Sequence, residues 1–138
     1  MKLYPAGRRY RGRLLTLKRR AEFQRLRGGI RWSGKAFLIE GKRRVATVDA
    51  PQPLQTRFGF TITKKIGQAH ERNRMRRRLS HALRTLALPP TLTEWDCVVV
   101  ARRAALDIPF DALVAEFAAA IARLGRQAGT KPFTGGEP

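Results

Sequence analysis

The stretch from residue 57 to residue 87 changes its apolar period from two to 3.6, which places a strand directly before an amphipathic helix. In RFGFTITK, residues 57–64, apolar residues alternate with small or polar ones, as in a half-buried strand. Gly67 breaks this strand, and the period predicts a helix from about 69 to 87. One arc of roughly 100° on that helix is apolar and must face a sheet. It contains Met75, Leu79, Ala82, Leu83 and Leu86.

The opposite side of the predicted helix is basic and polar. Because a helix N-terminus carries a partial positive charge, each cation near it costs roughly 0.3–1 kcal/mol. Between residues 70 and 84 the only acidic residue is Glu71, whereas an ordinary solvated face mixes both signs. A bound polyanion would offset these costs, so we interpret this side as a phosphate-binding surface. Asn73, Arg74, Arg77, Arg78, His81 and Arg84 lie on it, while Arg72 and Arg76 border the apolar stripe.

The whole chain shares this imbalance. It has 29 lysines and arginines against 10 acidic residues, a net charge of +19, which favours nucleic acid as the partner and an anionic membrane as the second choice. The helix could enter a DNA major groove, but structured RNA, recognised by its shape and phosphates, fits at least as well. No apolar run approaches the length of a membrane span, and the basic N-terminus lacks the apolar core of a signal peptide. We therefore expect a cytoplasmic protein without membrane contact.

The remaining pattern indicates one domain. We expect a basic arm at 1–15, a folded domain at 16–126 and a disordered tail at 127–138. Within the domain the predicted order is α-β-β-β-α-β-α, an α+β fold with one sheet packed by helices. Besides the strand and helix above, the elements are a helix at 17–27, strands near 35–40, 43–49 and 95–102, the last of them central and buried, and a helix that Pro109 opens and Gly125 ends. The core stripe of the last helix is Phe110, Leu113, Val114, Phe117, Ile121 and Leu124.

The sequence shows little catalytic chemistry of its own. If both are helical, His70 and His81 lie about 16 Å apart along the axis, too far to act on one phosphate, so we interpret them as surface residues. Cys97 lies among valines and is interpreted as a buried, inert thiol. Glu94 and Asp96 could hold Mg²⁺, although surface carboxylates at the start of a strand are the better interpretation. A stand-alone nuclease is therefore disfavoured.

The stretch RFGFTITKKIGQAHERNRMRRRLSHALR resembles the core of the bacterial ribonuclease P protein subunit. The match includes the lysine pair before the turn, the spacing of the Gly and Ala residues, and the Arg-Asn-Arg triplet followed by further arginines. Upstream, LKRRAEFQRLRGG resembles the first helix of that family, and downstream DCVVVARRAA resembles its last strand. The resemblance covers about residues 14–124. Composition alone would favour a ribosome-like structural RNA protein, and only this motif spacing speaks against it.

The resemblance implies a subunit of an endoribonuclease. Such a subunit binds a large catalytic RNA and the 5′ leader of precursor tRNA, and the complex removes the leader in tRNA maturation. The RNA performs the cleavage and holds most of the Mg²⁺, so the protein alone is expected to be inactive, and no stable protein partner is expected. The family also implies a left-handed β-α-β crossover, against the usual handedness.

The resemblance further implies which residues meet RNA. The catalytic RNA would be bound by Lys64, Lys65, Arg72, Asn73, Arg74, Arg76, Arg77 and Arg78. A leader cleft would lie between the sheet and the first and last helices, where bases stack on Phe23 and Phe37; plain core packing is the alternative for both rings. Arg27 and Glu40 stand where some relatives carry further aromatics. Glu40 would repel a leader phosphate unless it points away or holds a metal ion.

Overall fold

Five strands form one sheet in the order β1-β4-β5-β3-β2. The computed structural model describes residues 15–16, 28–43, 56–92 and 95–130. Strand β5 pairs in parallel with β4 and antiparallel with β3, so it is the central strand that its continuous apolar run predicts. Strand β1 runs parallel to β4 and β2 antiparallel to β3. The strands are Leu15–Thr16 (β1), Ile30–Ser33 (β2), Phe37–Arg43 (β3), Arg57–Thr61 (β4) and Trp95–Ala101 (β5).

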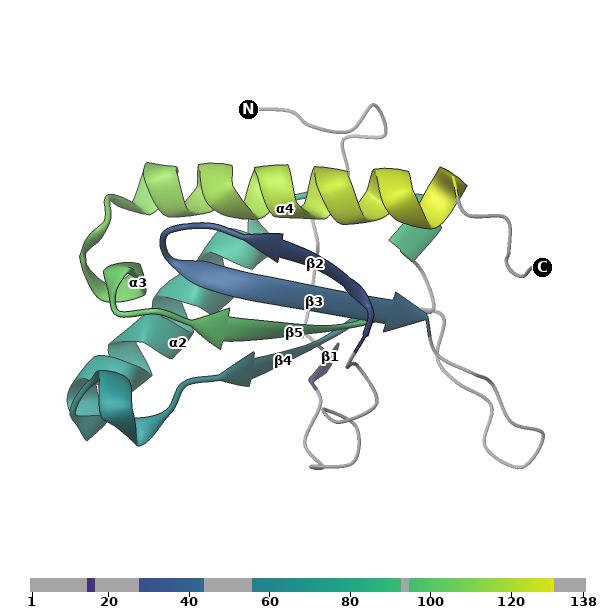
Figure 1. Ribbon diagram of the computed structural model, residues 1–138. Coiled ribbons are helices and arrows are strands. Elements are labelled where there is room, and N and C mark those ends of the chain that lie inside the picture. Colours follow the sequence, from purple (N-terminus) through teal and green to yellow (C-terminus); the bar gives the residue numbers. More distant parts are fainter. Residues whose placement is uncertain (1–14, 17–27, 44–55, 93–94, 131–138) are drawn as a thin grey trace.

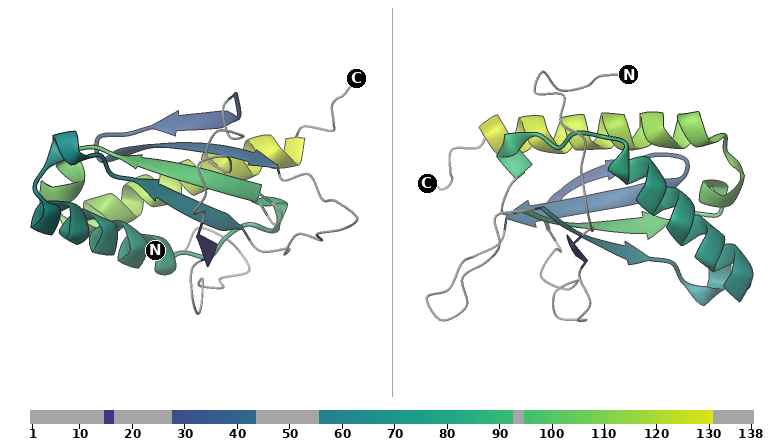
Figure 2. Two further views of the ribbon diagram at one scale, coloured as in Figure 1. Left: turned by 90° about the horizontal axis from the view of Figure 1, so that it is seen from below. Right: turned by 180° about the vertical axis from the view of Figure 1, so that it is seen from behind.

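Two long helices cover one face of this sheet (Figures 1 and 2). They are α2 (Ala69–Arg84) and α4 (Phe110–Thr130). Shorter helical turns flank them: η1 (Lys64–Ile66), η2 (Pro90–Leu92) and α3 (Ala104–Asp107). The core lies between the sheet and the two long helices. Its fully buried side chains include Phe37, Ile39, Phe58 and Val99 from the sheet, Met75, Leu79 and Leu83 from α2, and Leu113, Phe117, Ile121 and Leu124 from α4.

Helix α2 connects two neighbouring parallel strands, β4 and β5. Seen from behind, α2 lies in front of the sheet and both strands point the same way (Figure 2, right). When the strands are turned to point upward in this view, the step from β4 to β5 goes to the left. The crossover is therefore left-handed, as the family resemblance implies and against the preference of most β-α-β units. It brings η1 and the start of α2 to the end of the sheet where β5 stops.

Several boundaries differ from the predicted ones. Strand β2 and helix α3 were not expected, and β3 runs from Phe37 to Arg43 rather than over 35–40. The helix predicted to reach 87 ends at Arg84. The predicted arm apart from β1, the first helix, the strand beyond residue 43 and the tail beyond residue 130 lie outside the described residues.

The last helix departs from the expectation at both ends. Phe110 was placed in the core stripe, but its side chain is 41% exposed. Gly125 was predicted to end the helix, yet α4 continues to Thr130, so the predicted tail from residue 127 begins too early. Gly125 is buried because η2 approaches it closely: the Thr91 hydroxyl donates to its carbonyl at 2.9 Å, and a Cβ at Gly125 would lie 2.8 Å from the Pro89 side chain. The glycine thus permits a close contact rather than a helix end.

Candidate nucleic-acid interface

The basic helix α2 starts with a capping box. The N–H of its N-cap residue, Gln68, donates to Glu71 Oε1 at 2.9 Å, and the Gln68 side chain accepts from the backbone N–H of Glu71. This reciprocal pair satisfies two backbone donors that helix geometry leaves without partners. The carboxylate also puts negative charge where the helix dipole is positive. The first turn of α2 is therefore well defined although arginines crowd it.

The two sides of α2 separate as the apolar period predicts. Met75, Leu79, Ala82 and Leu83 are fully buried against the sheet and α4. The exposed side is basic, and the Arg76 guanidinium there donates to the Asn73 amide oxygen at 3.0 Å. The exposed polar residues of this side, together with the two lysines of η1, which precedes it, are here called the basic face. Its exposed members are Lys64, Lys65, His70, Asn73, Arg74, Arg76, Arg77, His81 and Arg84.

Arg78 does not belong to that exposed set, which corrects the prediction that it faces outward. Its half-buried guanidinium donates to two backbone carbonyls, that of Ala105 at 2.6 Å and that of Ile108. These carbonyls belong to α3 and the residue that follows it. Because α3 was not predicted, no local pattern indicated that an arginine would point there. The first role of Arg78 is therefore to fasten α3 to α2.

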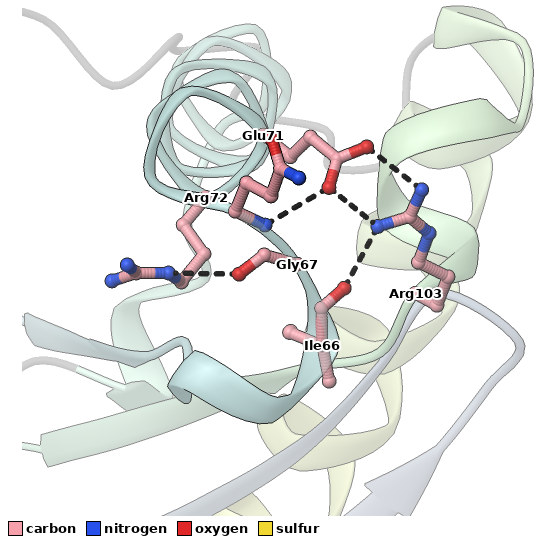
Figure 3. A network of polar contacts seen from close by, with 6 residues as sticks. Ile66, Gly67, Glu71, Arg72 and Arg103 are labelled. Carbon is pink, nitrogen blue, oxygen red and sulfur yellow. Dashed lines mark hydrogen bonds and ion pairs between the residues drawn. The ribbon is translucent and has the colours of Figure 1, made fainter.

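Arg72, expected at the edge of the apolar stripe, is half-buried there. Its Nε donates to the Gly67 carbonyl at 3.2 Å, across the turn between η1 and α2. A second arginine reaches the same turn from the other end of the crossover. Arg103, which follows β5, donates through Nη1 to the Ile66 carbonyl at 2.9 Å (Figure 3).

The guanidinium of Arg103 also forms an ion pair with Glu71 (Figure 3). Arg103 Nη1 donates to Glu71 Oε1 at 2.9 Å and Nη2 to Glu71 Oε2 at 2.8 Å, a bidentate ion pair. The hydrogen bond from Arg103, followed by that from the Gln68 N–H, lowers the pKa of Glu71 from 4.5 to about 2. The pKa of Arg103 is raised, first by its hydrogen bond to Glu71. The only acid of the basic helix is thus ionised and matched by a cation from outside the helix.

Gly67 leaves room for this arrangement. A Cβ at that position would lie 2.9 Å from both Arg103 Nη1 and Glu71 Oε1. Its backbone is extended, with φ 168°, so the requirement for glycine is one of space and not of backbone conformation. The turn therefore packs directly against the ion pair.

The described helices include none that is long and apolar enough to cross a membrane. Within the described ranges, no cluster of three or more His, Cys, Asp or Glu residues has the geometry to hold a metal ion. His70 and His81 are exposed on α2, and the thiol of Cys97 is buried, as their sequence context indicates.

Comparison with known proteins assigns the chain to a family. The profile of the Ribonuclease P family matches residues 12–125. The chain belongs to the ribonuclease P protein family. It is 40% identical over 126 residues to the ribonuclease P protein component of Brucella suis, with 88% of each chain covered. The component from Bartonella quintana is 40% identical over 100 residues, covering 72% of this chain and 75% of that protein. Membership indicates a subunit of an endoribonuclease with a general role in tRNA processing.

Solved ribonuclease P proteins share the fold. The protein from Thermotoga maritima superimposes with a TM-score of 0.60 at 18% identity, covering 80% of this chain and 96% of that one. A Staphylococcus aureus ribonuclease P protein superimposes with a TM-score of 0.60 at 18% identity, covering 83% and 97%. At such identities the likeness supports the fold alone, and the sequence relatives carry the family assignment.

Of the two phenylalanines predicted in the leader cleft, Phe37 is enclosed in the core. Phe37 is fully buried, and its ring stacks on Phe117 of α4 at a centroid distance of 4.2 Å. Trp32 packs on it at 5.6 Å. A base has no access to this ring, so core packing, the alternative for Phe37, holds in the structure. Phe23 and Arg27 lie outside the described residues.

Two carboxylates also differ from their expected surroundings. Asp96 was interpreted as a surface residue but is only 3% exposed. It accepts from Arg57 Nε at 2.8 Å and from Arg57 Nη2 at 2.7 Å, a bidentate pair between β5 and β4. Glu40 accepts from the Gly28 N–H at 3.0 Å, so its carboxylate is engaged by backbone. Glu94 lies outside the described residues.

Proposed function

We propose that this chain binds the catalytic RNA of ribonuclease P through the basic face. The single observation that carries the proposal is the separation of α2 into a buried apolar side and an exposed side of cations. The arginine and lysine side chains of the basic face can contact the phosphates of a folded RNA. Lys64 and Lys65, in η1, add two cations of the basic face before the start of α2. Arg72 and Arg78 donate to backbone carbonyls. We therefore propose that they stabilise the basic face and make fewer direct contacts with the RNA.

We further propose that the complex removes the 5′ leader of precursor tRNA by Mg²⁺-dependent hydrolysis. The RNA carries the catalysis and holds most of the metal ions, and the protein binds the leader and raises substrate affinity. The family assignment supports this division of labour. Leader contact is proposed for the sheet face opposite the helices, because Phe37 is enclosed on the helix side. The complex acts in the cytoplasm, without a membrane and without a second stable protein partner.

Reconstitution tests the proposal. The pure protein, a bacterial ribonuclease P RNA, and both together are assayed on precursor tRNA at low Mg²⁺. We expect leader removal only with both, because low Mg²⁺ makes the RNA depend on protein cations for charge neutralisation. Cleavage by the protein alone would overturn the division of labour. An unchanged rate on adding the protein would overturn the proposed subunit role.

A further inference from the structure

The turn between η1 and α2 directly follows the two lysines of the basic face, and arginines donate to the carbonyls of Ile66 and Gly67 there. Arg72, from α2 itself, holds the Gly67 carbonyl, and Arg103, from beyond β5, holds the Ile66 carbonyl (Figure 3). Arg103 and Ile66 are 37 positions apart in the chain, so the second contact fixes the turn to a different part of the fold. A backbone segment held from two directions has little freedom to rotate.

Arg103 makes three contacts of normal length within this small region. They reach the Ile66 carbonyl at 2.9 Å and the two carboxylate oxygens of Glu71 at 2.9 and 2.8 Å. Glu71 Oε1 accepts in addition from the Gln68 N–H at 2.9 Å. The guanidinium therefore joins the end of η1, the N-cap of α2 and the end of β5 in one network. A lysine could not reproduce it, because an ammonium lacks the planar fork that matches a carboxylate.

We propose that Arg103 and Glu71 are positioning residues for RNA binding: they hold Lys64 and Lys65 at a fixed place relative to the arginines of α2. The proposal rests on the proposed RNA binding by the basic face and assigns roles to two residues outside the predicted binding set. An RNA fold presents its phosphates at fixed spacing, so cations held in register bind without the entropy cost of ordering the turn.

The proposal predicts effects that run against simple charge counting. Glu71→Gln removes one negative charge and so raises the net charge of the protein by one, and Coulomb attraction alone would tighten binding to RNA. The glutamine oxygen still accepts from the Gln68 N–H, but its NH₂ group faces the Arg103 guanidinium and the bidentate pair is lost. We expect this variant to bind about three- to tenfold more weakly, as for residues coupled in one network.

Two further variants disrupt the network at constant charge. Arg103→Lys keeps the cation and loses the fork. Gly67→Ala introduces a Cβ that would lie 2.9 Å from Arg103 Nη1 and Glu71 Oε1, both ends of flexible side chains that the new group would displace. Because these ends can move, the chain is expected to fold. Both variants are expected to weaken binding to a similar extent as Glu71→Gln.

Arg102 provides the matched control. It precedes Arg103, is also exposed, and donates through Nη1 to the Gly34 carbonyl at 2.6 Å and through Nη2 to the Ser33 hydroxyl at 3.0 Å. These contacts hold the turn between β2 and β3. Arg102→Lys therefore removes a guanidinium that makes comparable hydrogen bonds to a different turn. We expect this variant to bind the RNA as the unchanged protein does.

The experiment measures the affinity of each variant for a bacterial ribonuclease P RNA, with circular dichroism as a check on folding. Weaker binding by Glu71→Gln, Arg103→Lys and Gly67→Ala, with Arg102→Lys unchanged, supports the proposal. As a positioning test, Lys64→Ala/Lys65→Ala is measured alone and with Arg103→Lys. The lysine substitutions should cost less in the Arg103→Lys background, because the lysines there are already out of register.

The outcomes separate this inference from the proposed function. If the unchanged protein does not bind the RNA, RNA binding itself fails. If it binds and Glu71→Gln binds equally well or more tightly, only the positioning role is overturned. Additive effects of Arg103→Lys and the double lysine substitution would overturn it as well.

Discussion

The guanidinium of Arg103 and the carboxylate of Glu71 meet through two contacts, of 2.9 and 2.8 Å, at the N-terminus of the basic helix. The two residues lie 32 positions apart in the chain. Their contact joins the residues after β5 to the first turn of α2 within the left-handed crossover. Glu71 thereby serves three partners at once: the helix dipole, its own capping box and an arginine from the far side of the crossover. Because this pair occupies the only carboxylate of α2, the exposed arginines of the helix keep their charge for an RNA partner.

The titration of Glu71 should show whether its ion pair with Arg103 forms in solution. Its pKa of about 2 lies below the ordinary 4.5, so the carboxylate stabilises the folded state above about pH 4.5 and this contribution is lost as pH falls toward 2. We expect NMR of the side-chain carboxyl carbon to give a midpoint near 2 in the unchanged protein. In Arg103→Gln the midpoint should rise toward 4.5. A midpoint near 4.5 in the unchanged protein would mean that the pair does not form in solution.

The exposed arginines of α2 should act through phosphates. Arg74→Ala/Arg77→Ala should weaken binding to a ribonuclease P RNA and lower the slope of log affinity against log salt by about 1 for each lost phosphate contact. Binding is measured over a series of salt concentrations. Arg123→Ala/Arg126→Ala, which removes two exposed arginines of α4, is the control for net charge and should leave the slope closer to that of the unchanged protein. Equal slopes for the unchanged protein and the α2 variant would contradict direct phosphate contact.

Arg78 should behave differently from its neighbours on α2. Its guanidinium serves the carbonyls of Ala105 and Ile108, so Arg78→Ala leaves both without their donor. We expect the free energy of unfolding in urea to fall by about 1–3 kcal/mol, with a salt slope for RNA binding close to that of the unchanged protein. Arg77→Ala, one position earlier and exposed, should show the reverse pattern. An unaffected stability in Arg78→Ala would show that α3 does not depend on this contact.

The sequence predicted best what one element determines by itself. The period of 3.6 identified the buried side of α2, and the apolar run of 95–102 identified the central strand β5. Both predictions rest on the spacing of apolar residues within one element, which does not depend on how the elements pack together. The family resemblance supplied the crossover handedness, which no local pattern contains.

The errors arose where the decisive partner is far away in the chain. Nothing local distinguishes Arg78 from the arginines that were predicted to face RNA, and for the same reason no role was predicted for Arg103. Gly125 looked like a helix end because its contact with Thr91 and Pro89 is invisible in local sequence. Phe37 was equally compatible with a core and with a cleft until α4 was placed over it. Sequence periodicity assigns a side chain to a face, but packing decides what covers that face.

Removing one partner of the ion pair between Arg57 and Asp96 should destabilise the β4–β5 contact. Asp96 is 4% and Arg57 15% exposed in their side chains, and their contact is bidentate. Asp96→Ala removes the carboxylate that this largely buried guanidinium contacts through two nitrogens, and we expect a loss of about 3–5 kcal/mol in the free energy of unfolding. Arg57→Ala/Asp96→Ala should lose less than the two single variants added together, as measured by urea denaturation in a double-mutant cycle. Additive losses would argue against coupling between them.

The enclosed ring of Phe37 should contribute to folding and not to leader binding. Phe37→Leu keeps an apolar side chain but removes the stacking on Phe117, and we expect it to lower the free energy of unfolding by about 1–2 kcal/mol. Leader contact is read from the affinity of the reconstituted complex for precursor tRNA relative to tRNA without a leader. That ratio should not change. Phe117→Leu removes the other ring of the same stack and is the matched control. If Phe37→Leu lowers the ratio and Phe117→Leu does not, the ring of Phe37 meets the leader, and α4 must move away from β3 when substrate binds.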